Sequence, residues 1–137
     1  MTAWAKSLIR ISNYEVETLQ KRLAEVTGRR MDAEMKLTML DARAEGERVG
    51  TPSDPQSQLM LHAYLQGFKQ HRLNAEADIA AIAVEEEGAR DALTAAFEEL
   101  KKFEQVAENT RLQKLVEANK RETAAFDEMG LRRRAVS

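Results

Sequence analysis

The sequence VGTPSDPQ, residues 49–56, contains both prolines of the 137-residue chain and one of its six glycines. Proline lacks the backbone N–H and restricts the residue before it, so a helix cannot run through this stretch. Gly50 suits the end of an incoming helix, whereas Ser53 or Asp54 can cap an outgoing helix that has Pro55 in its first turn. The stretch therefore predicts a turn between two helices.

The predicted organisation is a single domain over residues 1–137. We expect a first helix at about 4–48, a loop at 49–55, a second helix at about 56–129 and a basic tail at 130–137. A short connection makes two helices antiparallel neighbours. The predicted fold class is therefore all-α, an antiparallel two-helix coiled-coil hairpin with a longer C-terminal helix.

Both predicted helices carry two seams of mostly apolar residues. In the first helix these seams are Ile9, Val16, Leu23, Arg30, Leu37 and Ala44, and Leu19, Val26, Ala33 and Leu40. In the second they are Leu65, Arg72, Ile79, Glu86, Leu93, Leu100 and Ala107, and Leu61, Phe68, Ala75, Ile82, Ala89, Ala96 and Phe103. Sustained alternation of spacings of three and four is the coiled-coil signature.

The three charged seam residues predict a register. If the turn centres near Ser53, residues that face each other have numbers that sum to about 106. This register sets Arg72 opposite Glu34, Arg30 opposite Glu76 and Asp78, and Glu86 near Lys21 and Arg22. Because an unpaired charge in a seam would cost several kcal/mol, the three charge matches favour this register.

The second helix is longer than its partner. In the predicted register the first helix ends opposite a point near residue 105, so about 20 or more residues of the second extend beyond it. A single solvated helix of this kind is only marginally stable. We therefore expect Leu112, Leu115, Val116 and Phe126, which follow a break in the heptad phase, to contact a partner outside this chain.

The composition, with 32% charged and 5% aromatic residues, is typical of long helices. The absence of cysteine excludes disulfides and thiolate metal sites, and a net charge of −2 argues against a dedicated nucleic-acid binder. The longest apolar run, residues 79–84, is too short to span a bilayer, and no signal-peptide pattern opens the chain. We expect a cytosolic helical protein without a transmembrane segment.

Groups that could carry out catalysis are few. His62 and His71 are nine residues apart, so they do not share a helix face as a zinc-binding pair would. Glu85, Glu86 and Glu87 point about 100° apart around a helix and cannot converge on one metal ion. No glycine-rich phosphate loop is present. The sequence therefore predicts a protein that is not an enzyme and that has no cofactor and no metal site.

Three surfaces remain as candidates for binding. The first is a stripe of Tyr64, Phe68 and His71, which is either ordinary packing beside the seam or a docking patch. The second is the open end of the hairpin, formed by Trp4, Lys6, Arg10 and Tyr14 with Arg111, Lys114, Lys120 and Arg121. The third is the run of arginines at 132–134, which either complements the helix dipole or meets an acidic partner or lipid head groups.

Three sequence segments, taken in order along the chain, resemble the FliJ family, whose members are small coiled-coil proteins of the bacterial flagellar type III export apparatus. These are LHAYLQGF at 61–68, KKFEQVAE at 101–108, and NKRE at 119–122 followed by FDE at 126–128. The resemblance covers nearly the whole chain. The short tip loop and a mildly truncated first helix depart from the family pattern.

The resemblance implies a non-enzymatic stalk that inserts its open end into the hexameric export ATPase. It also implies contacts with the cytoplasmic domain of the export gate and with export chaperones, and a cytoplasmic location, peripheral at the inner membrane. In this chain the ATPase contacts would be Arg10, Tyr14, Arg111, Lys114, Lys120 and Arg121. The gate contacts would be Tyr64, Phe68 and His71.

Other functions are compatible with the sequence. Virulence type III secretion systems use a similar coiled-coil stalk, which this sequence separates poorly from the flagellar one. A structural rod that self-associates through the apolar tail is a second alternative. A helical arm that binds nucleic acid would need a basic stripe along one side. Residues 85–104 carry seven acidic and three basic residues, which argues against this function.

Overall fold

The computed structural model describes residues 3–136, which form two helices. Helix α1 spans Ala3–Gly50 (48 residues) and helix α2 spans Pro55–Val136 (82 residues). No strand occurs within these residues. The predicted fold class, an antiparallel two-helix coiled-coil hairpin with a longer second helix, is confirmed.

The turn forms as its sequence predicts. The side chain of Asp54 caps α2, because its Oδ2 accepts a hydrogen bond from the backbone N–H of Ser57 at 3.0 Å. Hydrogen bonds from the side chain of Ser57 and from its backbone N–H lower the pKa of Asp54. Pro55 occupies the first position of α2, where its missing N–H is not needed. At the end of α1, the Thr51 hydroxyl donates a hydrogen bond to the backbone carbonyl of Glu47.

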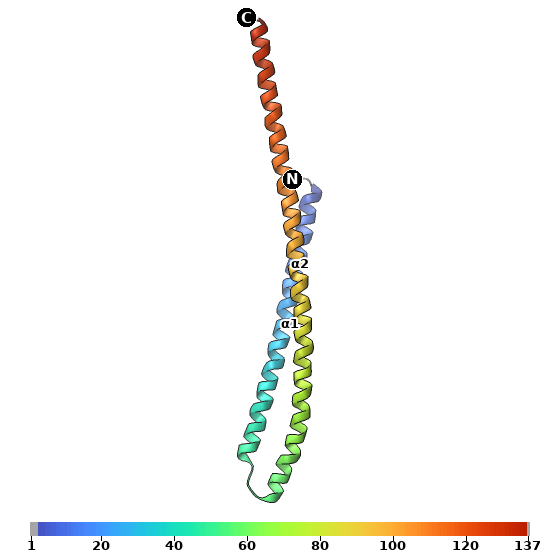
Figure 1. Cartoon of the computed structure of the whole chain (residues 1–137), viewed down its shortest axis with the longest axis vertical. Coiled ribbons are helices and arrows are strands. Elements are labelled where there is room, and N and C mark those ends of the chain that lie inside the picture. Colours follow the sequence, from blue (N-terminus) through green and yellow to red (C-terminus); the bar gives the residue numbers. More distant parts are fainter. Residues whose placement is uncertain (1–2, 137) are drawn as a thin grey trace. The chain divides into compact units, whose positions relative to one another are not determined.

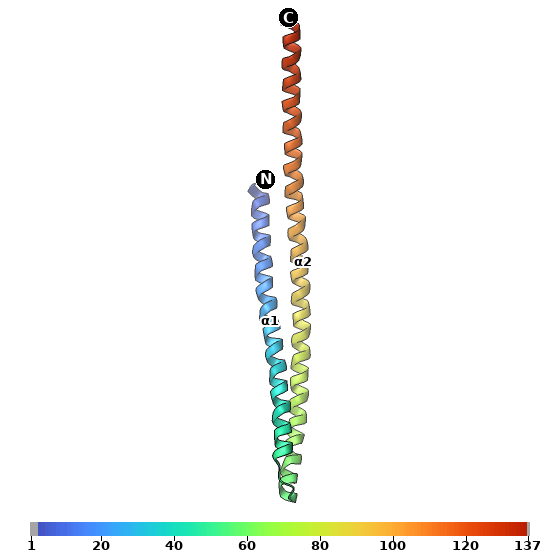
Figure 2. The same cartoon turned by 90° about the vertical axis from the view of Figure 1, so that its left-hand side faces the viewer.

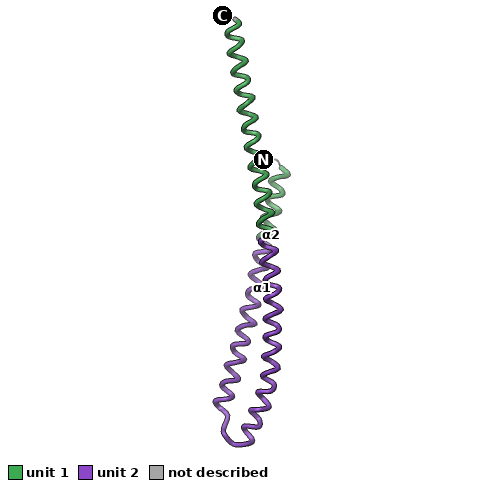
Figure 3. The backbone as a smooth tube through the Cα atoms, in the orientation of Figure 1, with its two compact units in different colours: residues 1–16, 95–137 green, residues 17–94 purple. Residues whose placement is uncertain are grey.

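The chain divides into two compact units (Figure 3). Unit 2 is residues 17–94, and the described part of unit 1 is residues 3–16 with 95–136. Unit 2 contains the turn and the two helix segments that flank it, which lie antiparallel (Figure 1). Its expected seam positions are all buried or half-buried. Val26, with no exposed surface, and Ala44, with 3% exposed, are its most deeply buried apolar residues.

The register of unit 2 differs from the predicted one by about two helical turns. Arg72 pairs with Asp41 at 3.0 Å, whereas the prediction set it opposite Glu34, farther from the turn. The reason lies in the loop, which carries the chain past the end of α1 before α2 begins. A hollow beside the turn is consequently lined by Gly50 together with Leu61, well inside α2.

The other two charged seam residues pair with each other. Arg30 Nε donates hydrogen bonds to both carboxylate oxygens of Glu86 at 3.0 Å, so the predicted partners Glu76 and Asp78 are wrong. Glu86 is only 7% exposed. The hydrogen bond from Arg30 lowers the pKa of Glu86 and raises that of Arg30. Each charged seam residue therefore meets an opposite charge, as expected, but in a different register.

Beside this pair, Glu85 binds two arginines of α1. Arg29 Nη1 donates to both oxygens of Glu85 at 3.1 Å, and Arg22 also donates to Oε1. Arg22 was predicted to lie near Glu86. The hydrogen bond from Arg29 is the main reason that the pKa of Glu85 is lowered. The carboxylates of two successive residues of α2 thus link it to α1.

In unit 1 the start of α1 lies beside α2, as both views show (Figures 1 and 2). Val16 is 5% exposed, Leu100 8% and Ala107 5%, so the expected seam continues here. The helix α2 then continues to Val136. Every residue from 111 to 135 is exposed, which agrees with the expected overhang.

The predicted end of the second helix near residue 129 is wrong. The residues expected to form a basic tail continue α2, and Arg132 donates to Glu128 at 3.2 Å, one turn back. Gly130 does not terminate the helix, because no described glycine has a positive φ. Leu131 and the arginines after it are good helix formers, so they offset the cost of one glycine.

Candidate functional site

The tail of α2, residues 111–135, is the most exposed segment of unit 1. Leu112 is 44% exposed, Val116 51% and Phe126 66%. At 100° per residue, these three lie roughly 170° around the helix from the buried Ala107 and the half-buried Thr110. The apolar stripe of the tail therefore faces away from the side of α2 that packs on α1.

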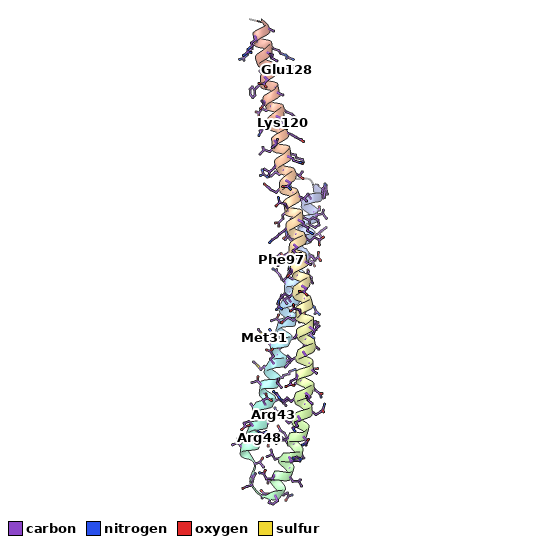
Figure 4. The ribbon with its side chains drawn as sticks, viewed as in Figure 1. Met31, Arg43, Arg48, Phe97, Lys120 and Glu128 are labelled. Atoms are coloured by element: carbon purple, nitrogen blue, oxygen red, sulfur yellow. The ribbon has the colours of Figure 1, made fainter. Side chains whose placement is uncertain are left out.

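Four of the residues predicted to contact an ATPase lie on this tail. Arg111 donates to Glu108 on the preceding turn at 2.8 Å, and this bond raises the pKa of Arg111 and lowers that of Glu108. Lys114, Lys120 and Arg121 are exposed. Lys120, labelled in Figure 4, lines a shallow groove on the tail. At 100° per residue, Arg111 and Lys120 flank the apolar stripe of the tail, whereas Lys114 and Arg121 lie on the opposite side of the helix.

The other two predicted ATPase contacts lie on α1 in the same unit. Arg10 is exposed, and its guanidinium donates to the hydroxyl of Ser7 at 3.4 Å. Tyr14 is 72% exposed, and Trp4, also on α1, is 62% exposed. The structure therefore gathers all six predicted residues in unit 1, on the exposed surfaces of its two helix segments.

The predicted gate contacts lie together on α2 in unit 2. Tyr64, Phe68 and His71 line a hollow of about 510 Å³ that also includes Leu40 of α1. Phe68 is half-buried in the seam, Tyr64 is 36% exposed and His71 is exposed. The stripe therefore combines packing with an accessible surface.

One residue of α1 that lines this hollow, Arg43, was not among the contacts predicted from the sequence. The predicted register, in which facing numbers sum to about 106, already set Arg43 opposite residue 63, beside Tyr64. The observed register moves Arg43 along α2 by about two turns, toward His71. The position of Arg43 opposite residue 63 was therefore the signal in the sequence that could have added it to the predicted contacts.

A second surface of unit 2 was also missed. Met31, Met35 and Met39 are 57%, 64% and 60% exposed, and Met31 is labelled in Figure 4. Their spacing places them on the face of α1 turned away from its seam. This spacing of four was the signal that could have revealed the face. Exposed methionines adapt to differently shaped partners, so the face is a candidate contact surface.

Among residues 3–136 no three acidic or histidine side chains gather in a way that could hold a metal ion. Neither helix contains, within the same residues, a stretch long and apolar enough to cross a membrane.

Comparison with known families matches residues 6–136 to the family described as "Flagellar FliJ protein". Two relatives described as "Flagellar FliJ protein" come from Caulobacter vibrioides, one from strain NA1000 / CB15N and one from strain ATCC 19089 / CIP 103742 / CB 15. Each is 52% identical over 136 residues, which cover 99% of this chain and 98% of the relative. No solved structure matches the chain.

Proposed function

The chain belongs to the FliJ family of flagellar proteins, and on this premise we propose that it is a non-enzymatic component of the bacterial flagellar type III export apparatus. In this proposal it inserts unit 1 into the hexameric export ATPase and contacts the export gate through unit 2. Export chaperones are its third class of partner. It works at the cytoplasmic face of the inner membrane. The flagellar names of its relatives support this system over a virulence secretion system.

The exposed tail of α2 is the observation that carries the ATPase contact. A helix exposed on all faces from residue 111 to residue 135 gains no tertiary packing, and tertiary packing is what stabilises most helices. A pore that surrounds this tail would supply the missing contacts. Because the apolar stripe faces away from the α1 side of α2, the partner would need an apolar surface on that side.

Charge supports the same contact. Lys114, Lys120 and Arg121 lie on the tail without a carboxylate of the described chain within 4.0 Å. Complementary charges speed the encounter of two proteins and set their orientation. We therefore expect the pore of the ATPase to present acidic side chains to these cations.

The ATPase contact is tested with the double variant Arg111→Glu with Lys120→Glu. It should abolish binding to the export ATPase and stimulation of its ATP hydrolysis, while circular dichroism shows unchanged helicity. The matched control is Lys101→Glu with Lys102→Glu, which makes the same charge change on α2 before the tail. Intact binding and stimulation in the first variant would overturn the assignment of the tail.

The gate contact is tested with Tyr64→Ala combined with His71→Ala, because both side chains are exposed enough to be removed without opening the seam. Cells that carry this variant should swim less, and the purified variant should keep its helicity. Leu73→Ala, which removes another exposed side chain of α2, is the control. Unchanged motility, or loss of helicity, would contradict a contact role for the stripe.

Sedimentation separates the proposal from a self-associating rod. The proposal predicts a monomer at micromolar concentration, whereas a bundle formed through the tail would give a tight oligomer.

A further inference from the structure

The hollow beside Tyr64, which we call the Arg43 hollow, has an apolar floor. Leu40 of α1 and Phe68 of α2 line it, and both are half-buried seam residues. Its volume of about 510 Å³ is enough for a large apolar side chain of a partner.

The hollow exists because two small residues of α2, Ala63 and Gly67, line it. A Cβ atom built on Gly67 would meet no atom within 4 Å, so open space lies above this glycine. A glycine inside a helix lowers the stability of that helix relative to alanine. Gly67 therefore keeps open a space that a larger side chain would fill.

The rim of the hollow carries a cation without a partner. Within unit 2, where every residue is described, six arginines lie within 4.0 Å of a carboxylate: Arg22, Arg29, Arg30, Arg48, Arg72 and Arg90. Arg43, the seventh, is labelled in Figure 4. It lines the hollow together with His71 and has no such carboxylate. The structure thus leaves one guanidinium available beside an apolar floor.

We propose that the Arg43 hollow binds a segment of a partner in which an apolar side chain stands next to a carboxylate. The apolar side chain packs on Leu40 and Phe68, and the carboxylate pairs with the fork of Arg43, with His71 as a second donor. This inference rests on the proposed function, since the partner is the cytoplasmic domain of the export gate.

The chemistry of the rim favours a carboxylate over a polyanion. Nucleic acids are bound by many cations that follow a chain of phosphates. Arg43 and His71 form a short rim above an apolar floor, and this arrangement fits one carboxylate with an apolar neighbour. The occupant is therefore a protein segment.

The first test measures binding of the full-length chain to the purified cytoplasmic domain of the export gate by calorimetry. Arg43→Glu should raise the Kd by at least about 10-fold, because it replaces a charge-assisted pair by repulsion. Arg48→Glu is the control, since it makes the same charge change on α1 at an arginine that pairs with Glu45. Its Kd should change less than about threefold.

The second test fills the hollow. Gly67→Leu should weaken binding by a similar factor although it raises the thermal stability of the helix. Gly88→Leu is its control, because this glycine also has open space around its added Cβ and lies on the same helix outside the hollow. A variant that is more stable and yet binds more weakly cannot be explained by loss of folding.

A charge swap identifies the partner's carboxylate. Aspartates and glutamates of the gate domain are changed singly to arginine, and one such variant should restore binding to Arg43→Glu. If no gate variant restores binding, the carboxylate pairing is overturned.

The outcomes separate the two proposals. If the gate domain does not bind the unchanged chain, both the proposed gate contact and this inference fail. If it binds but Arg43→Glu and Gly67→Leu leave the Kd unchanged, only this inference fails. If the variants instead alter self-association in sedimentation, the occupant is a second copy of the chain and the inference is wrong.

Discussion

Replacement of Val26 by alanine tests the seam of unit 2, because Val26 is the one large side chain there with no exposed surface. The change removes two methyl groups, which at about 0.8 kcal/mol per buried carbon costs ~1.6 kcal/mol. The space left behind adds about 1 kcal/mol, and the higher helix propensity of alanine returns about 0.6 kcal/mol. We therefore expect the free energy of unfolding to fall by about 2 kcal/mol.

Val84→Ala is the matched control, because Val84 lies in the same unit and is 74% exposed. It makes the same chemical change with the same gain in helix propensity, so it should stabilise slightly. Urea unfolding followed by circular dichroism at the helix minimum measures both variants. The two should differ by about 2.5 kcal/mol. A difference below about 0.5 kcal/mol would show that the seam does not bury Val26 and would refute the packing of unit 2.

Three further changes probe the polar seam, the turn and the tail. The hydrogen bonds with Arg30 lower the pKa of Glu86 below its ordinary value of 4.5, so the pair stabilises the fold above that pH and loses its effect as the pH falls through the lowered pKa. Glu86→Gln should therefore lower the melting temperature at pH 7, and in acid the melting temperatures of the variant and the unchanged chain should become equal. A constant difference at all pH values would contradict the pairing. Asp54→Ala should lower the melting temperature because it removes the cap of α2, whereas Asp54→Asn keeps a side-chain oxygen and should lower the melting temperature much less. An equal decrease in melting temperature for both variants would mean that the cap is not formed through the side-chain oxygen. Val116→Asp should leave melting nearly unchanged, because the side chain is exposed, and should weaken binding to the export ATPase at least about 10-fold; unchanged binding would exclude the apolar stripe from the contact.

The seams were predictable residue by residue because they depend only on local periodicity. Val26, Ala44 and Leu100, placed on the seams by their spacing, are all buried. The cap at Asp54 was predictable for the same reason, since it involves only the next turn of the chain.

The register was not predictable, because it depends on the path of the loop in space. The prediction assumed a turn centred near Ser53, and this assumption placed Arg72 opposite Glu34. In the structure the loop carries the chain past the end of α1, so Arg72 pairs with Asp41 instead. Both partners are acidic and lie two turns apart on one face, so the charge pattern could not separate them.

The end of α2 was mispredicted because glycine is a weak stop signal. Gly130 does not adopt the positive φ with which glycine commonly ends a helix, and it remains helical here. The six predicted ATPase contacts and the three predicted gate contacts are exposed or line a hollow, but their roles depend on partners and stay predictions.

The proposal that another molecule grips the tail of α2 is tested most directly by amide hydrogen exchange of the full-length chain, alone and with the export ATPase hexamer. Residues 111–135 should exchange fast in the free chain, because they have no tertiary packing, and slowly in the complex, while residues 17–94 change little. If the complex forms and protection appears in residues 17–94 with the tail still exchanging fast, the tail is not what the ATPase binds.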